Sequence, residues 1–195
     1  MTHEEILSIF KRTNALLEGH FQLTSGLHSP QYFQCAKVLQ YPEYAERLCG
    51  IVARHFENQQ IDVVIAPALG GIVVGQEVGR QLDARTLFAE RKDGVMQLRR
   101  GFEITKGEHA LVCEDVITTG GSVREVIDIV KTHGGAVVGV GAIVDRSGGT
   151  VVLPALFATV VMDVITYKPE KCPLCLNGVP IDKPGSRETS RAQRA

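Results

Sequence analysis

The sequence predicts a single α/β domain in which a central parallel sheet is flanked by helices. Apolar runs alternate with amphipathic stretches from residue 42 to residue 144, which is typical of strand–helix–strand units. The apolar runs are short and almost continuous, as expected for strands buried on both faces. Two of them end in glycine-containing loops, at residues 68–71 and 118–122. In open α/β sheets, ligands bind beyond the carboxyl ends of such strands.

Size and composition fit one soluble globular domain. The chain has 195 residues, of which 44% are hydrophobic and 22% are charged. Its net charge of −1 gives no reason to expect nucleic acid as a partner, and no apolar stretch approaches the roughly 20 residues of a membrane span. The N-terminus is acidic and lacks the apolar core of a secretion signal. The number of cysteines, five, is odd, so we expect a reduced, cytoplasmic chain without a disulfide framework.

Residues 1–40 form a small N-terminal part. Thr2 to Glu5 has the pattern of a capping box, and we expect a helix over about residues 3–18 that ends at Gly19. Residues 20–34 contain two short extended runs joined by a turn at Ser25 and Gly26. Taken alone, this segment is a β-hairpin or an irregular flap with core aromatic residues.

Residues 41–170 form the core, and residues 171–195 form a C-terminal segment of different composition. Hydrophobic periodicity and glycine or proline boundaries define the expected elements of the core. We expect helices over residues 42–59, 72–82 and 122–133, and strands over residues 61–66, 85–90, 110–113, 136–144 and 157–167. Residues 93–105 are expected to be a loop flanked by Gly94 and Gly101.

The most informative stretch runs from residue 110 to residue 124. An apolar strand ends there in two acids, Glu114 and Asp115, and a loop of small and hydroxyl residues precedes the next helix. Backbone N–H groups of the loop, residues 118–122, can bind a phosphate at the helix N-terminus. The carboxylates suit hydroxyl groups or a divalent cation, so ribose 5-phosphate fits the pattern. The loop lacks the spacing of a Rossmann or P-loop motif, and a solvated strand end is the alternative interpretation of the acids.

Residues 112–122 resemble the phosphoribosyl diphosphate (PRPP) motif of the type I phosphoribosyltransferases. The resemblance implies the fold of that family, with a small N-terminal hood, and a role for the two acids in holding the ribose 2′- and 3′-hydroxyls. It implies that PRPP is also bound by the residues that follow the acids and by a pyrophosphate loop, namely Val116, Ile117, Thr118, Thr119, Gly120, Gly121, Ser122, Gly70 and Gly71. Arg91 and Lys92 match the Arg-Lys pair of the family, which makes Lys92 and Asp115 the catalytic candidates.

Residues 25–33 resemble the S-G-x-x-S-x-x-[YF]-[YF] segment of the orotate phosphoribosyltransferases. In that family the segment forms the hood over the pyrimidine, so Tyr32 and Phe33 are candidate orotate contacts, together with Thr118. Arg146 follows the strand over residues 136–144 and would bind the orotate carboxylate, for which a guanidinium is well shaped. An ion pair of Asp145 and Arg146 with each other or with a neighbour is the alternative interpretation.

The sequence also departs from the family pattern. Thr24 and Gly70 stand where part of the orotate family carries lysines, and the loop over residues 93–105 lacks the expected histidine. Arg99 and Arg100 lie in this loop and are either solvated or functional. Such a loop commonly closes over a substrate, and in relatives it reaches into the neighbouring subunit.

The C-terminal segment contains Cys172 and Cys175 in a C-x-x-C spacing that resembles half of a zinc ribbon. Tetrahedral zinc needs four ligands, and no histidine or cysteine follows. A site shared across a dimer two-fold axis is therefore one possibility. Residues 183–195 are polar and are expected to be disordered at the end.

The resemblance as a whole implies an orotate phosphoribosyltransferase, a pentosyltransferase of pyrimidine (UMP) biosynthesis. It would convert orotate and PRPP to orotidine 5′-monophosphate and diphosphate, with Mg²⁺ bound through PRPP, in a homodimer with a shared active site. Two alternatives remain, a phosphoribosyltransferase for another nucleobase and a regulator that binds PRPP without catalysis.

Overall fold

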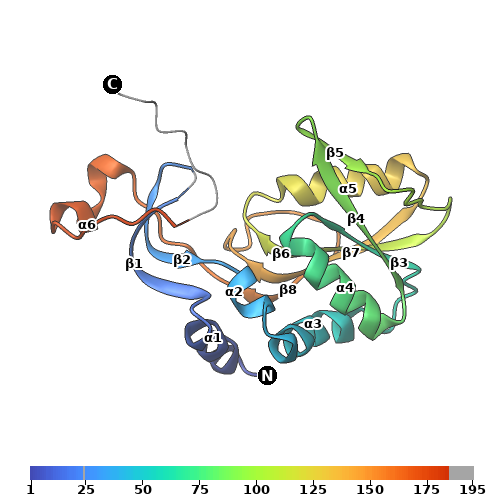
Figure 1. The fold of residues 1–195 in the computed structure, drawn as a ribbon, viewed down its shortest axis with the longest axis horizontal. Coiled ribbons are helices and arrows are strands. Elements are labelled where there is room, and N and C mark those ends of the chain that lie inside the picture. Colours follow the sequence, from blue (N-terminus) through green and yellow to red (C-terminus); the bar gives the residue numbers. More distant parts are fainter. Residues whose placement is uncertain (24, 185–195) are drawn as a thin grey trace.

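The computed structural model describes residues 1–23 and 25–184. The described chain has a core built on one large sheet and a smaller N-terminal part beside it (Figure 1). The helices are α1 (His3–Arg12), α2 (Ala36–Leu39), α3 (Pro42–Phe56), α4 (Gly70–Leu82), α5 (Gly121–Thr132) and α6 (Pro173–Leu176), with a 3₁₀ turn at Pro169–Lys171. The strands are β1 (Leu16–Gln22), β2 (His28–Phe33), β3 (Val63–Pro67), β4 (Arg85–Lys92), β5 (Val95–Leu98), β6 (His109–Ile117), β7 (Ala136–Asp145) and β8 (Leu156–Val161).

The large sheet has six strands in the order β5-β4-β3-β6-β7-β8. All neighbouring pairs are parallel except β4 and β5, which form an antiparallel hairpin. Residues 93–105 were expected to form a loop, but residues 95–98 form strand β5, so the expectation is wrong for that part. Asp93 and Gly94 take φ values of 53° and 82°, the left-handed conformation that closes tight hairpins. An Asp-Gly pair is a strong hairpin signal, and it sets the β4–β5 turn here.

Helices cover both faces of the sheet, with α3 and α4 on one side and α5 on the other (Figure 1). Alternate residues of β3 show the division. Val64 and Ala66 pack in the cluster that contains α3 and α4 residues, whereas Val63 and Ile65 pack in the cluster that contains α5 residues. All four side chains are fully buried, which explains why the central strands are continuously apolar.

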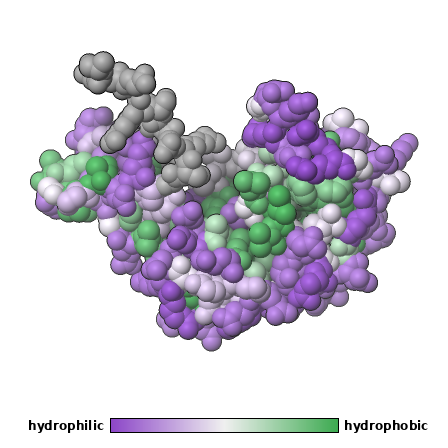
Figure 2. Space-filling view, viewed as in Figure 1, coloured by the Kyte–Doolittle hydropathy of each residue, from purple (hydrophilic) through white to green (hydrophobic). Residues whose placement is uncertain are grey.

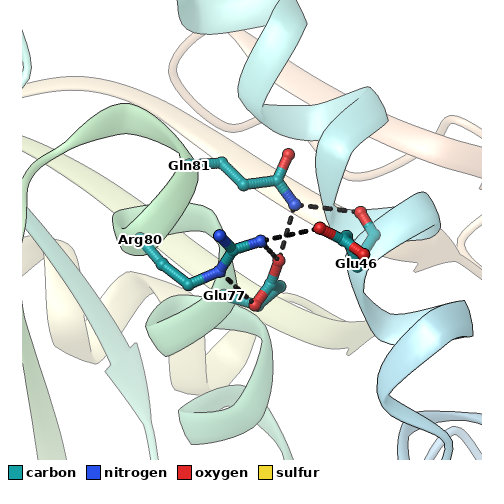
Figure 3. A network of polar contacts seen from close by, with 4 residues as sticks. All are labelled: Glu46, Glu77, Arg80 and Gln81. Atoms are coloured by element: carbon teal, nitrogen blue, oxygen red, sulfur yellow. Dashed lines mark hydrogen bonds and ion pairs between the residues drawn. The ribbon is translucent and has the colours of Figure 1, made fainter.

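A polar network joins α3 to α4 on the outside of the core (Figure 3). The Arg80 guanidinium donates to Glu77 and to Glu46 Oε1, the latter at 3.0 Å, and the Gln81 amide donates to the backbone oxygen of Glu46. The hydrogen bond from Arg80 holds the pKa of Glu77 below its usual value. Because Arg80 and Glu46 are exposed, we expect these contacts to fix the helix register more than to stabilise the fold.

The first helix is shorter than expected, because it ends at Arg12 and Leu17 lies on a strand. Asn14 has a φ of 53°, its N–H donates to the Lys11 oxygen, and the Ala15 N–H donates to the Phe10 oxygen. This is a Schellman cap, and Asn is the residue other than Gly that most readily takes its left-handed position. The helix stop is therefore Asn14 and not Gly19.

The hood hairpin, β1 and β2, is antiparallel and receives two further contacts from the C-terminal part of the chain. His28 pairs with Tyr167, and Phe21 pairs with Asp182. The expected strand over residues 157–167 is accordingly too long, because β8 ends at Val161 and Tyr167 belongs to the hood. Two strands alone are marginally stable, so these contacts support the hairpin.

Among the described helices, none has the length and apolarity needed to cross a membrane.

Candidate active site

A cradle of backbone N–H groups lies between β6 and α5, at residues 118–122. Gly120 takes a φ of 72° and caps α5, which turns the chain so that successive amides point the same way. Among the described residues, none of the five cradle N–H groups donates to a protein acceptor. A small hollow lined by Glu114 and by residues 116–123 lies over them. These free donors at a helix N-terminus form an anion site suited to a phosphate.

Arg124 supports the cradle from behind and was not found by the sequence reasoning. Its Nη1 donates to the Thr119 oxygen at 2.7 Å, and its Nη2 donates to the Val152 oxygen at 3.2 Å. Arg124 therefore ties the cradle to the segment that leads to β8. One signal was available, because a basic residue near the first turn of a helix is electrostatically unfavourable and needs a local reason.

The acidic pair, Glu114 and Asp115, lies at the carboxyl end of β6 beside the cradle. Glu114 is buried, and its Oε1 accepts from the Asp115 N–H at 3.0 Å. Asp115 Oδ1 accepts from the Val116 N–H at 2.9 Å. Burial, followed by the neighbouring charge of Asp115, raises the pKa of Glu114 to about 9. In the free protein at neutral pH, Glu114 is thus protonated and can donate as well as accept a hydrogen bond.

The glycine loop before α4 contacts the acidic pair directly. A Cβ atom at Gly70 would overlap the Asp115 carboxylate, and one at Gly71 would lie 3.0 Å from Glu114 Oε1. The two glycine loops, at the ends of β3 and β6, therefore meet at one edge of the sheet. In this arrangement Gly70 leaves no room for a side chain, and the lysine that part of the orotate family carries there would displace Asp115.

Arg146 is a largely buried charged residue at this edge of the sheet. Its N–H donates to the Ile117 oxygen at 2.8 Å, which places it where the cradle begins. The side chain is largely buried, and among the described residues its Nε has no hydrogen-bond partner. Burial lowers the pKa of Arg146, and Tyr32 of the hood opposes that effect. Among the described residues, no ion pair joins Asp145 to Arg146, and Asp145 Oδ1 accepts from the Ser147 N–H instead.

The two hood aromatics are placed differently. Tyr32 packs against Phe21 with ring centroids 5.7 Å apart and lies near enough to Arg146 to affect it. Phe33 points to the other face of β2, where it is buried 4.9 Å from the Phe10 ring. The structure thus brings Tyr32, but not Phe33, toward Arg146.

The basic residues of the β4–β5 hairpin are mostly engaged within the protein. Arg91 binds Glu125 of α5 at 2.8 Å, beside a hollow of about 450 Å³ between β5 and α5 that the cradle does not share. Arg99 and Arg100 both pair with Glu90, at 3.4 and 3.0 Å. Lys92 is exposed at the end of β4 and makes no ion pair with another described residue. The structure therefore leaves Lys92 available and does not bring Arg91 to the cradle.

Three other expectations concern residues outside this edge. Cys172 and Cys175 lie against the hood, beside His20 and His28, and not at the cradle. Thr24, where a family lysine is missing, is outside the described residues, as is the polar tail after residue 184.

Known proteins match this chain over its core and over its whole length. The phosphoribosyl transferase domain family matches residues 36–167. A protein of Chlorobaculum parvum named orotate phosphoribosyltransferase is 58% identical over 192 residues, which cover 98% of this chain and 100% of that one.

Solved structures show the same fold at lower identity. The orotate phosphoribosyltransferase of Aeropyrum pernix matches with a TM-score of 0.67 at 22% identity, over 80% of this chain and 93% of that one. The adenine phosphoribosyltransferase of Rhodothermus marinus matches with a TM-score of 0.65 at 22% identity, over 82% of this chain and 100% of that one. The expected type I phosphoribosyltransferase fold is confirmed, but the fold does not distinguish the nucleobase.

The full-length sequence relatives make that distinction. Their matches cover 96–98% of this chain, whereas the phosphoribosyl transferase domain family matches only residues 36–167. The chain therefore belongs to the phosphoribosyltransferase family and, within it, to the orotate phosphoribosyltransferases.

Proposed function

We propose that the edge of the sheet described above binds PRPP and orotate together and transfers the phosphoribosyl group to the orotate nitrogen, giving orotidine 5′-monophosphate and diphosphate. The observation that carries this proposal is the burial of the Arg146 guanidinium without a partner for its Nε. A buried guanidinium with an unpartnered Nε, set between the cradle and Tyr32, is costly unless an anion completes it. A carboxylate on a flat ring fits that position, and uracil, hypoxanthine and adenine carry none.

The free amides of residues 118–122 support binding of the 5-phosphate. Glu114 and Asp115 are the next groups along the same edge, and their oxygens suit the two ribose hydroxyls. Hydroxyl donors favour the ionised form of a carboxylate, so PRPP binding would lower the pKa of Glu114 and release a proton. Tyr32 would then cover the pyrimidine whose carboxylate Arg146 holds.

The leaving diphosphate would lie against the loop that contains Gly70 and Gly71. Backbone amides can approach a ligand closely there because the glycines lack side chains. Lys92 is the available cation of the β4–β5 hairpin, and we assign it the role of stabilising the departing charge. Arg91 would contact PRPP once its ion pair with Glu125 opens.

Carboxylate oxygens are the ligand type that Mg²⁺ prefers, so the acidic pair is compatible with the Mg²⁺ that we propose to enter with PRPP. The ion would reduce the charge of the diphosphate. The chain itself needs no nucleophile, because orotate attacks the ribose carbon as the diphosphate leaves. Its residues contribute positioning and electrostatic stabilisation.

We further propose a homodimer with shared active sites. Apolar side chains gather over the beginning of α4 (Figure 2), where Leu69 is 83% exposed and Val73 is 44% exposed. This area adjoins the Gly70–Gly71 loop, so a second subunit that covered it would border the site.

A cytoplasmic location is also proposed, and five cysteines without a disulfide agree with a reducing compartment.

The test is the loss of orotate absorbance when the protein, PRPP and Mg²⁺ are mixed, with uracil, hypoxanthine and adenine in parallel. We expect turnover of orotate alone. Turnover of another base would preserve the PRPP site and overturn the role of Arg146. Binding of PRPP without turnover of any base would indicate a regulator.

A further inference from the structure

The C-terminal segment and the hood bring four metal-binding side chains together outside the active site. They are His20 on β1, His28 on β2, Cys172 and Cys175. Their ligand atoms all lie within 4.8 Å of one another, although 152 residues separate His20 from Cys172. We propose that these four residues form a tetrahedral Zn²⁺ site that fastens the C-terminal segment to the hood hairpin. This inference is independent of the proposed function.

The distances between the ligand atoms fit zinc. A tetrahedron with Zn–N near 2.05 Å and Zn–S near 2.3 Å places its ligands about 3.3 Å apart for two nitrogens and about 3.6 Å apart for nitrogen and sulfur. His20 Nε2 lies 3.1 Å from His28 Nδ1 and 3.5 Å from Cys172 Sγ. Cys175 Sγ lies 3.3 Å from His28 Nδ1 and 3.7 Å from His20 Nε2. Because all the ligand atoms lie within 4.8 Å of one another, a movement of about 1 Å lets one ion contact all four.

His20 is also held in the form that a metal requires. Its Nδ1 lies 2.8 Å from the Val179 oxygen, an acceptor, so Nδ1 carries the proton and Nε2 presents its lone pair to the cluster. A ligand histidine oriented by a carbonyl on its other nitrogen is the usual arrangement at zinc sites. The carbonyl comes from the same C-terminal segment as the cysteines.

Hydrogen bonds alone account poorly for the cluster. Three atoms, His28 Nδ1, Cys172 Sγ and Cys175 Sγ, surround the one lone pair of His20 Nε2, which can accept well from only one donor. A cation at the centre accommodates all of them, and two thiolates would neutralise the charge of Zn²⁺ in a largely buried place. His20, His28 and Cys172 are buried, while Cys175 is exposed and offers a path of entry.

These ligands differ from the possibility raised by the sequence, in which the C-x-x-C pair would share a metal across a dimer two-fold axis. Both histidines belong to the same chain and precede the cysteines. The site also has a structural consequence, since the hood is a two-stranded sheet held by few other contacts. Strand β2 carries both His28 and Tyr32, so the metal would fix the strand that approaches Arg146.

The experiment is metal analysis of the full chain purified without a histidine tag. We expect about one Zn²⁺ per chain, lost in Cys172→Ser/Cys175→Ser and in His20→Asn/His28→Asn. Cys49→Ala is the matched control, because Cys49 is a buried thiol of α3 outside the cluster, and it should retain the metal. Zinc that survives in both double variants, or a wild-type chain without zinc, would overturn the proposal.

A second measurement covers the case in which the variants do not fold. Wild-type protein stripped of zinc by a chelator and loaded with Co²⁺ should show thiolate-to-cobalt charge transfer and the visible bands of a tetrahedral site. Stripping should also lower Tm, with recovery on adding Zn²⁺. Absence of the charge-transfer band, or a Cys172–Cys175 disulfide in protein freshly purified under reducing conditions, would refute the site.

Discussion

At the scale of single residues, Glu114 illustrates how burial changes the chemistry of a carboxyl group. Its pKa of about 9 in the folded chain compares with an ordinary value of 4.5. The folded state therefore binds more protons than the unfolded state between these values, and stability falls as pH rises through that range, by up to about 1.4 kcal/mol per pH unit.

The Glu114→Gln substitution should remove this pH dependence. We expect the ligand-free variant to have a higher Tm than the wild type at pH 8, with the difference shrinking toward pH 4.5. Thermal melts of both proteins across this pH range measure it. A constant difference at all pH values would show that Glu114 is already ionised in the free protein.

Asp115 is half-buried, whereas Glu114 is buried, which makes Asp115 the better candidate for direct contact with the ribose. Asp115→Asn keeps the shape of the side chain but removes its charge, so turnover should fall at least about tenfold. The Tm should not fall, because the amide oxygen of Asn can still accept from the Val116 N–H. Steady-state kinetics with saturating PRPP and Mg²⁺ are the measurement, and unchanged turnover would refute the assigned role.

Arg146 gives a residue-scale prediction in which function and stability change in opposite directions. Arg146→Met should raise the KM for orotate about tenfold or more, the value of a charge-assisted hydrogen-bonded pair, while the KM for PRPP changes little. The Tm should stay or rise, because a buried guanidinium with an unpartnered Nε is removed.

Arg47→Met, on the exposed side of α3, is the control and should alter neither KM. A rise in both KM values for Arg146→Met, with a lower Tm, would mean that Arg146 has a structural role only.

At the scale of elements, the two glycine loops depend on each other. Gly70→Ala places a methyl group against the Asp115 carboxylate, so we expect a lower Tm and a higher KM for PRPP. In the Asp115→Ala background the obstruction is gone, and Gly70→Ala should then cost much less stability. The four proteins form a double-mutant cycle. Equal losses of Tm in both backgrounds would show that the loops do not interact.

Local sequence patterns were sufficient to predict most helices and strands of the core. The alternation of apolar runs and amphipathic stretches predicted α3, α4, α5 and their intervening strands, because each pattern is local. Asn14 and the Asp93–Gly94 pair carried local signals as well, and weighing them would have placed the end of α1 and the β4–β5 hairpin correctly.

At the scale of the whole molecule, the proposed dimer makes a prediction about mixed subunits. If Lys92 of one subunit serves the site of the other, coexpressed Lys92→Ala and Asp115→Asn chains form heterodimers with one intact site. Random pairing would restore about a quarter of the wild-type activity. Each variant alone should be nearly inactive, and no recovery in the mixture would place Lys92 and Asp115 in the same subunit's site.

The sequence by itself determined the strand–helix order, the acidic pair, the phosphate cradle and the position of Arg146 after β7, because each depends on residues close together in the chain. It also supplied the C-x-x-C pair, but only half of a metal site. Tertiary structure decided which residues became buried and which distant ones met. Burial of Glu114 raised its pKa, packing turned Phe33 into the core and Tyr32 toward Arg146, and the hood placed His20 and His28 beside the two cysteines. Desolvation and long-range contact arise only when the whole chain has folded, so no local pattern could have predicted them.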